Sequence, residues 1–170
     1  PSHTSINDAI KICKDNNIDS ILAVGGGSVI DSSKIIACGR YYDGDAWDIV
    51  MGKVQISRAM PIVTILTLSA TGSEMNGTAV ISNVDMNYKK GMKSPLLVPK
   101  VSFLDPTITY SVNKYQTACG SFYILSHIFT FLNFFFISHT TKIFLLFFFF
   151  FFYLFFFFFF YIKINFKKKP

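Results

Sequence analysis

The 170-residue sequence contains only three cysteines, and it has no acidic residue beyond Asp105. Cys13, Cys38 and Cys119 are an odd number without paired spacing, a pattern that suggests neither a disulfide framework nor a zinc knuckle. Reduced thiols of this kind are typical of cytosolic proteins, so we expect a cytoplasmic location. The sequence also has neither an initiator methionine nor a signal-like apolar stretch at Pro1, and we expect further sequence upstream.

The lack of acidic residues in the last third explains the charge of the whole chain. Through Tyr110 the ten acidic residues are balanced by basic ones, and the net charge of +6 comes from the later lysines: Lys114, Lys142, Lys163, Lys167, Lys168 and Lys169. A basic tail on a neutral body, without alternating basic and aromatic residues, is not the pattern of a nucleic-acid-binding protein. We therefore expect no nucleic-acid partner.

The stretch ILAVGGGSVIDSSK, from Ile21 to Lys34, predicts a strand, a glycine turn and a helix start. Its four leading apolar residues are too few for a helix and typical of a short buried strand. Gly25 to Gly27 lack a Cβ atom, so a pyrophosphate can approach the main chain at the helix start. Ser28 can cap the helix or donate its hydroxyl to a phosphate. A turn without any ligand is the alternative, because glycine-rich turns are common.

A second strand followed by a polar turn is predicted from Pro61 onward. PIVTILTL, residues 61–68, is rich in β-branched residues and predicts a buried strand, and SATGSE, residues 69–74, follows it as a glycine-containing turn. Ligands of open α/β sheets bind in the crevice outside the carboxyl ends of the strands. Two such turns facing one crevice favour a ligand site over a bare turn.

The remaining segments predict further elements around these two strands. Apolar periodicity predicts helices over about residues 6–16, 30–38 and 113–129, and short strands are predicted at 78–82 and 99–104, flanking a basic segment at 88–97. Residues 41–57 are loop-like. Their acidic sequence DGDAWD lacks the ligand series of a calcium-binding EF-hand, and we expect Trp47 to pack this loop against the body.

Four ordered motifs together resemble the iron-containing (group III) alcohol dehydrogenases, and among them the butanol-dehydrogenase-like branch. They are AVGGGSVIDSSKIIA, TLSATGSE, SFLDPTITY and QTACGSFYILSH, and they extend over about residues 1–129, with divergence after about residue 122. The resemblance implies an α/β fold with a partial Rossmann-like dinucleotide-binding domain at residues 1–112. Residues 113–130 would form the first helix of a helical metal-binding domain. Residues 131–170 are a low-complexity tail of phenylalanine and lysine.

The resemblance further implies a cofactor, a substrate class and binding residues. The cofactor would be NAD or NADP, the substrate a small primary alcohol or aldehyde, and the family is often homo-oligomeric. Gly26, Gly27 and Ser28 would bind the pyrophosphate, with Asp31 on the nicotinamide side. The other implied cofactor-binding residues are Thr67, Leu68 and Thr71, which would line the adenine and ribose region, and Lys89. Taken alone, Lys89 is a solvated surface charge, and the two threonines are polar residues at a strand end.

The resemblance also implies a divalent metal, iron or zinc, held by one Asp and three His residues. The first two ligands lie four apart on a helix, in a GxxDxxxH motif that here reads GSFYILSH over residues 120–127. His127 matches, but the aspartate is replaced by Tyr123, which is a poor ligand for either metal. Thr130 stands at the expected glutamate, and His139 is too close in sequence to replace either later histidine. Because one imidazole cannot hold a catalytic metal, we expect that the metal is not retained.

The tail has two competing interpretations. Its phenylalanine and lysine runs are what A/T-rich DNA encodes, so our preferred hypothesis is a frameshift, an unspliced intron or a gene-model error. The alternative is a membrane anchor, since residues 143–162 are an uncharged stretch of about the twenty residues needed to cross a bilayer. Lys163 and the last three lysines would then lie on the cytoplasmic side.

The sequence therefore supports three functional hypotheses. The first is a fragment of an NAD(P)-dependent, metal-dependent alcohol dehydrogenase that is inactive as written. The second is a remnant that binds a dinucleotide without chemistry, and the third is a membrane-anchored fragment. The acidic or small residue that would read the ribose 2′ position is absent here, so the choice between NAD and NADP stays open, as do the substrate and the metal.

Overall fold

The computed structural model of the chain describes the backbone of residues 2–136 and the side chains of residues 2–131. The chain divides into two units, Pro1–Tyr123 and Ile124–Pro170. The expectations for His139 and for a membrane anchor at residues 143–162 lie outside the described residues. Within the described part, no helix combines the length and the apolar character that a membrane crossing requires.

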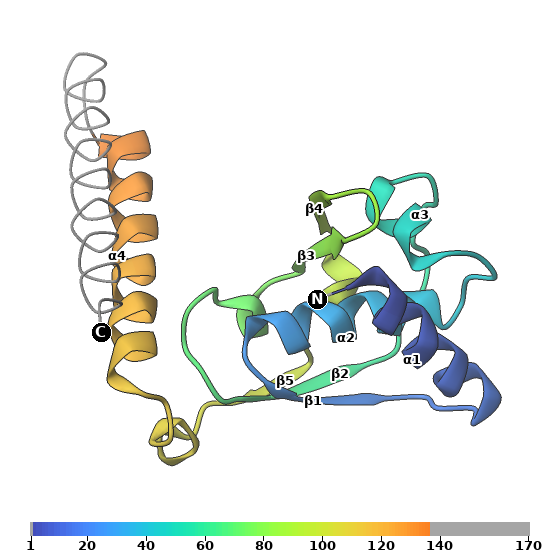
Figure 1. The fold of residues 1–170 in the computed structure, drawn as a ribbon, viewed down its shortest axis with the longest axis horizontal. Helices are drawn as coiled ribbons and strands as arrows, with labels where there is room; N and C mark the ends of the chain where they lie inside the picture. The colour runs from blue at the N-terminus through green and yellow to red at the C-terminus, as the bar shows by residue number, and fades with distance from the viewer. Residues whose placement is uncertain (1, 137–170) are drawn as a thin grey trace, which may run out of the picture. The chain divides into compact units, whose positions relative to one another are not determined.

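A three-stranded parallel sheet forms the base of the first unit. It consists of β1 (Ile21–Gly25), β2 (Ile62–Leu66) and β5 (Val101–Phe103), in the order β1-β2-β5 (Figure 1). Both predicted buried strands are present, and β2 lies between the other two. The parallel arrangement brings the carboxyl ends of β1 and β2 to one edge of the sheet, since Gly25 pairs with Leu66.

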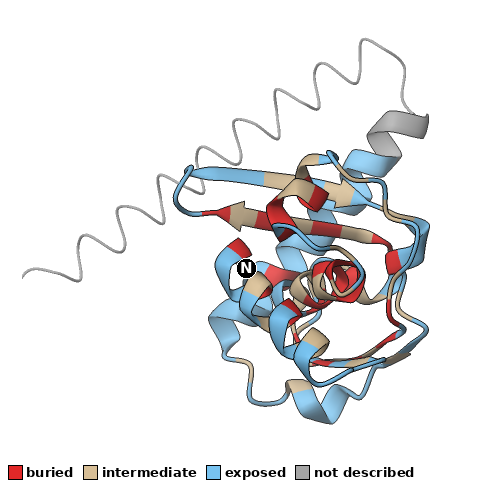
Figure 2. Ribbon diagram, turned by 90° about the vertical axis from the view of Figure 1, so that its right-hand side faces the viewer, coloured by how far each residue is buried: buried red, intermediate tan, exposed pale blue. Residues whose placement is uncertain are grey.

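Helix α2 (Gly27–Gly39) covers one face of this sheet. The residues of β1 and β2 that point toward it are buried and join the helix in one core cluster: Ala23, Ile30, Ala37, Met60, Ile62 and Leu66. The opposite face carries two apolar rows, set by the strand register: Leu22, Val63 and Val101 in one row, and Val24, Ile65 and Phe103 in the other. The residues of these rows on β1 and β5 are about half exposed or more. Figure 2 shows this division between buried and exposed parts.

A second layer packs on the other side of α2. It contains α1 (His3–Asp15), α3 (Ala46–Met51) and the antiparallel hairpin of β3 (Thr78–Asn83) and β4 (Tyr88–Lys93) (Figure 1). Ile6 and Ile10 of the first predicted helix are buried here. One core cluster holds this layer together: Ile6, Ile10, Ile35, Ala46, Trp47, Val50, Ala79 and Ile81. Helix α2 therefore packs on two sides, against the sheet and against this second layer.

The prediction that residues 41–57 form a loop is wrong, because they contain α3. Asp45 caps this helix, its carboxylate accepting a 2.7 Å hydrogen bond from the Trp47 backbone N–H. Gly52 ends the helix in the left-handed conformation, with φ of 76°. A capping acid and a terminating glycine are helix signals, and here they were hidden among the other acids. The prediction that Trp47 packs against the body is confirmed, since it is buried.

Other boundaries also differ from the prediction. Helix α2 begins at Gly27 rather than near residue 30, because Gly26 already supplies the first turn with its carbonyl acceptor. The basic segment at 88–97 contains β4, whose partner strand β3 settles its conformation. Short 3₁₀ turns occupy η1 (Ser73–Met75), η2 (Pro95–Leu97) and η3 (Pro106–Thr109), and α4 extends over Lys114–Phe136.

Candidate functional site

The glycine turn connects the end of β1 directly to the start of α2. Gly26 is the N-cap residue in an extended conformation, and its carbonyl accepts hydrogen bonds from the N–H groups of Val29 and Ile30. The first N–H groups of any α-helix have no partner within the helix and carry its positive dipole end. Gly27 and Ser28 occupy these positions, and Ser28 is exposed. The turn thus presents main-chain donors and a hydroxyl to an anion.

The second polar turn lies against the first. The Thr67 N–H donates a 3.1 Å hydrogen bond to the Gly25 carbonyl. A Cβ atom on Gly26 would lie 3.6 Å from Leu68 Cβ, and one on Gly27 would collide with Thr71 Oγ1. The structure therefore brings together six of the predicted cofactor-binding residues at the carboxyl edge of the sheet: Gly26, Gly27, Ser28, Thr67, Leu68 and Thr71.

Asp31 lies one turn into α2 and binds the protein on both carboxylate oxygens. Its Oδ1 accepts a 2.5 Å hydrogen bond from Ser73 Oγ, and its Oδ2 accepts a 2.9 Å bond from the Val80 N–H. The carboxylate thus links α2 to η1 and to β3. Asp31 was predicted on the nicotinamide side of a cofactor. In the structure its carboxylate contacts Ser73, a residue of the second turn.

Lys34 is a buried residue of this region that sequence reasoning missed. Its ammonium group donates hydrogen bonds of 2.7 Å to the Ser73 carbonyl, 2.8 Å to Ser73 Oγ and 2.7 Å to the Thr78 carbonyl. Burial lowers the pKa of Lys34 to about 8, against the opposing effect of the negative charges of Asp31 and Glu74. The spacing of Asp31 and Lys34 on one helix side was the available signal.

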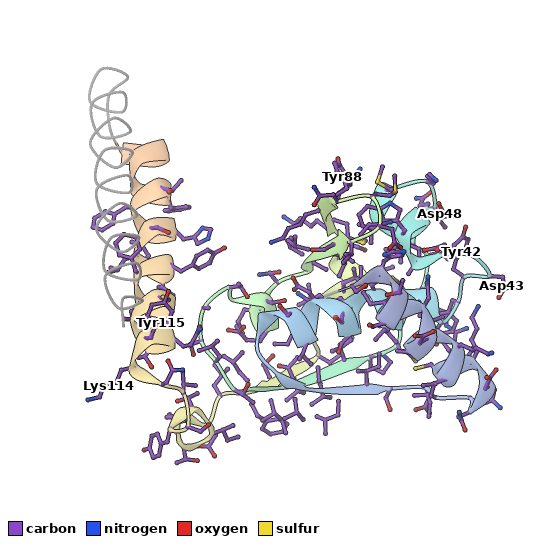
Figure 3. All side chains as sticks on the ribbon, viewed as in Figure 1. Tyr42, Asp43, Asp48, Tyr88, Lys114 and Tyr115 are labelled. Atoms are coloured by element: carbon purple, nitrogen blue, oxygen red, sulfur yellow. The ribbon has the colours of Figure 1, made fainter. Side chains whose placement is uncertain are left out.

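Lys89 lies apart from these residues in the contacts that the structure describes. It is exposed on β4, where it pairs with Ser82 of β3. Its neighbour Tyr88 lies at the tip of the hairpin, with its ring centroid 6.1 Å from that of Trp47 (Figure 3). None of the contacts described for residues 2–131 joins Lys89 to either turn.

The described residues do not fit the metal centre that the family uses. Tyr123 and His127 lie four apart on α4, so that one imidazole and one phenol stand where the motif has an aspartate and a histidine. Within the described part of the chain, no group of three or more His, Cys, Asp or Glu side chains could hold a metal ion. This donor set is too small and too weak for a catalytic divalent ion.

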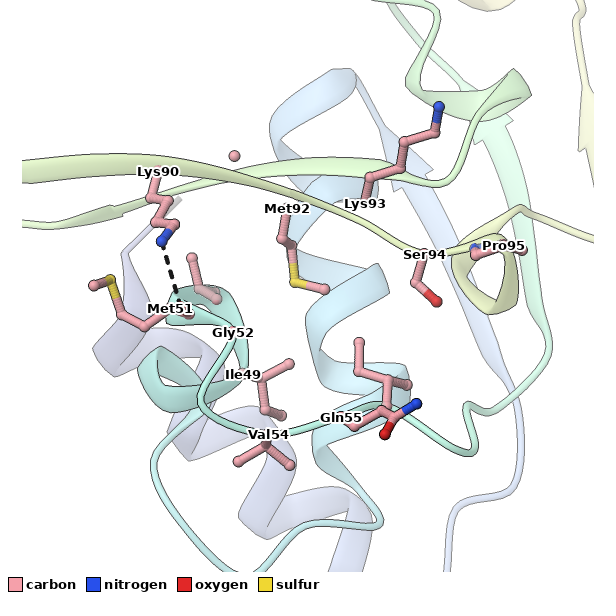
Figure 4. A pocket seen from close by; sticks show the side chains of 13 residues that line it. Ile49, Met51, Gly52, Val54, Gln55, Lys90, Met92, Lys93, Ser94 and Pro95 are labelled. Carbon is pink, nitrogen blue, oxygen red and sulfur yellow. Dashed lines mark hydrogen bonds between the residues drawn. The ribbon is translucent and has the colours of Figure 1, made fainter.

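A groove of about 390 Å³ lies between α3, the segment after it and β4 (Figure 4). Its walls are mostly aliphatic, with Lys90 and Lys93 from β4, and Lys90 Nζ lies 3.4 Å from the Met51 carbonyl, which it approaches as a donor. None of the predicted cofactor-binding residues lines this groove. It is therefore separate from the site formed by the two turns.

A parallel α/β sheet with a glycine turn at a helix N-terminus, and a second polar turn beside it, defines a Rossmann-like dinucleotide-binding class. A family model described as iron-containing alcohol dehydrogenase matches residues 1–106. The chain belongs to the iron-containing alcohol dehydrogenase family. This confirms the predicted fold class and the predicted family.

Relatives of known name support the assignment. The chain is 54% identical over 129 residues to NADH-dependent butanol dehydrogenase A of Clostridium acetobutylicum, which covers 76% of the chain and 33% of that protein. It is 38% identical over 123 residues to the NADPH-dependent aldehyde reductase YqhD of Escherichia coli, covering 71% of the chain and 32% of that protein. The relatives thus include both NADH- and NADPH-dependent proteins.

A solved structure gives the same result. The crystal structure of an NADH-dependent butanol dehydrogenase A from Thermotoga maritima matches with a TM-score of 0.73 and 45% sequence identity, covering 76% of the chain and 32% of that structure. The chain therefore spans about a third of the length of the relatives it matches. The activity of a complete family member is thus a proposal for this chain.

Proposed function

We propose that the chain derives from an alcohol dehydrogenase that transfers hydride between a small primary alcohol and NAD(P), and that it retains the dinucleotide-binding part of that enzyme. The observation that carries this proposal is the contact between the two turns, Gly27 against Thr71 and Gly26 against Leu68. Helix α2 supplies main-chain donors at this point, and a dinucleotide is the expected ligand because relatives of the chain are named as NADH- or NADPH-dependent.

Each residue of the site takes a role that its position supports. The N–H groups of Gly27 and Ser28 and the Ser28 hydroxyl bind the pyrophosphate at the positive end of α2. Thr67, Leu68 and Thr71 line the adenine and ribose region, because they lie beside the same turn. Asp31 lies on the nicotinamide side, where its carboxylate binds Ser73 and the Val80 N–H. Lys89 is the exception: it is assigned to the dinucleotide by the family resemblance alone, because no described contact joins it to either turn.

NADH titration tests this binding function. The full 170-residue chain should give a saturable change in nicotinamide fluorescence with NADH or NADPH. The Gly27→Ala substitution should weaken binding by about tenfold or more, since it forces Thr71 away from the turn and costs about 1.4 kcal/mol for each factor of ten. The Gly91→Ala substitution is the matched control: its Cβ atom meets only ordinary contacts and should change nothing. Absence of any saturable signal would contradict the proposal.

The chain should bind the dinucleotide without catalysing hydride transfer. The donor set at Tyr123 and His127 does not support a catalytic metal, and hydride transfer from an unpolarised alcohol is unfavourable. We therefore expect no butanol oxidation by the chain with added iron or zinc. Turnover at the rate of a complete family member would show that the chain is an active enzyme instead, whereas binding without turnover favours the non-catalytic binding remnant.

A further inference from the structure

The ammonium group of Lys34 is buried among acceptors that belong to the segment after the second turn. Ser73 contributes its carbonyl and its hydroxyl, Thr78 contributes its carbonyl, and Asn76 Oδ1 lies 3.4 Å away. These four acceptors belong to three residues of one segment, residues 73–78. A single side chain of α2 thus holds the full length of this segment.

The hydrogen-bond directions in this cluster follow from its chemistry. Ser73 Oγ donates to the Asp31 carboxylate, so the same oxygen accepts from Lys34. Asp31 and Lys34 are three apart on α2, on one side of the helix, and both contact Ser73. A positive and a negative side chain therefore clamp one serine from the same helix side.

The segment that is clamped is continuous with the second turn. Gly72, directly before Ser73, adopts the left-handed conformation with φ of 65°, and Asn76 Nδ2 donates a 2.7 Å bond back to the Gly72 carbonyl. Thr71, which contacts Gly27, precedes this glycine. The contacts that Lys34, Asp31 and Asn76 make with Gly72 and Ser73 thus also set the position of Thr71.

We propose that Lys34 is a positioning residue, which holds the turn around Thr71 against the glycine turn at the start of α2 and so gives the anion site its shape. For the ligand, this inference rests on the proposed dinucleotide-binding function. A buried ion costs desolvation energy that an apolar side chain would not, so stability alone is a weak reason for a lysine here. Its four directional contacts instead fix the conformation of a segment that has little apolar packing of its own.

The test compares Lys34→Met with Lys53→Met in the full chain. Methionine keeps the unbranched chain of lysine up to the ε position and removes the donors. Lys53 is an exposed lysine that binds only Asp48 in the described contacts. We expect amide hydrogen exchange in residues 71–76 to rise about tenfold or more in Lys34→Met, because loss of a buried hydrogen-bond partner leaves its acceptors unsatisfied. Exchange in β1 and β2 should change much less, and Lys53→Met should match the unsubstituted chain.

Affinity for NADH is the second readout. It should fall about tenfold or more in Lys34→Met and stay unchanged in Lys53→Met. A uniform rise of exchange throughout the chain, or unchanged exchange in residues 71–76, would overturn the positioning role. If the unsubstituted chain binds no NADH or NADPH, the proposed function fails, and the exchange measurement still decides whether Lys34 holds the turn.

A second variant covers the case in which Lys34→Met does not fold. Ser73→Ala keeps the charge of Lys34 and removes only the hydroxyl that joins it to Asp31. It should raise exchange in residues 71–76 and weaken NADH binding, in the same direction but by less than Lys34→Met. The conservative variant Ser73→Thr keeps the hydroxyl and should restore both. Unchanged exchange and affinity in Ser73→Ala would overturn the inference.

Discussion

At the scale of single residues, the charge of Lys34 couples folding to pH. The ammonium group is buried in the folded chain and solvated in the unfolded chain, so burial lowers the pKa of Lys34 from 10.5 to about 8 on folding. Between these two values the unfolded state binds more protons than the folded state. Stability from this residue therefore rises with pH across that window and is constant below it.

A comparison of Lys34→Met with the unsubstituted chain isolates this effect. Between pH 8 and 10, the free energy of unfolding of the unsubstituted chain should rise relative to Lys34→Met, by up to about 1.4 kcal/mol per pH unit. Urea unfolding followed by the fluorescence of Trp47, the single tryptophan, measures it. The hydrogen bond from Lys53 to Asp48 raises the pKa of Lys53, which stays largely protonated in both states over this range. Because Lys53→Met keeps Lys34, the difference in free energy of unfolding between it and the unsubstituted chain should stay nearly constant with pH. A flat difference for Lys34→Met would contradict the burial of this charge.

Some residues of the candidate site contribute through their backbone, and sequence patterns predict these well. Residues that contribute through a buried charge are harder to predict. Gly26 and Gly27 were predictable because a strand, three glycines and a helix leave few other geometries. Lys34 was not, because periodicity treats a lysine as an exposed residue. Its acceptors come from residues 73–78, and only the tertiary fold brings that segment over α2.

At the scale of elements, the two faces of the parallel sheet differ sharply. Helix α2 covers one face, whereas in the described residues the other presents two apolar rows from β1, β2 and β5. Leu22 on the open face is 60% exposed, and Ile62 on the face of α2 is 1% exposed. Parallel sheets in known folds are usually covered on both faces, which makes the state of this face in solution informative.

Alanine substitutions on the two faces test whether the open face is exposed in solution. Ile62→Ala should lower the free energy of unfolding by about 2–5 kcal/mol, because it leaves a cavity in the core. Leu22→Ala should lower it by less than about 1 kcal/mol, because the side chain is already largely solvated. Urea unfolding of both variants decides the matter. Similar losses for the two would mean that another part of the chain or a second copy covers this face.

The elements themselves were predictable where one signal dominated. Strands β1 and β2 and the apolar stripe of α1 follow from their patterns, and all three are present. Helix α3 was missed because it is short and its apolar residues do not extend over several turns. Its formation depends on the Asp45 cap and on burial of Trp47 against α1 and the hairpin, and the second of these is a tertiary effect.

At the scale of the whole molecule, the chain holds one part of a larger family architecture. It spans about a third of the length of its relatives, and both turns lie in its first unit, Pro1–Tyr123. The donor set at Tyr123 and His127 does not complete a metal centre. Binding of the dinucleotide and reaction with an alcohol are therefore separable questions for this chain, and each needs its own measurement.

The central claim is that the turns around Gly26 and Gly72 hold one dinucleotide together. Amide hydrogen exchange of the full chain, with and without saturating NADH, tests it most directly. We expect slower exchange on NADH addition in both residues 26–30 and residues 67–73, with no change in α1. Protection of only one of these two segments, or of neither, would contradict it.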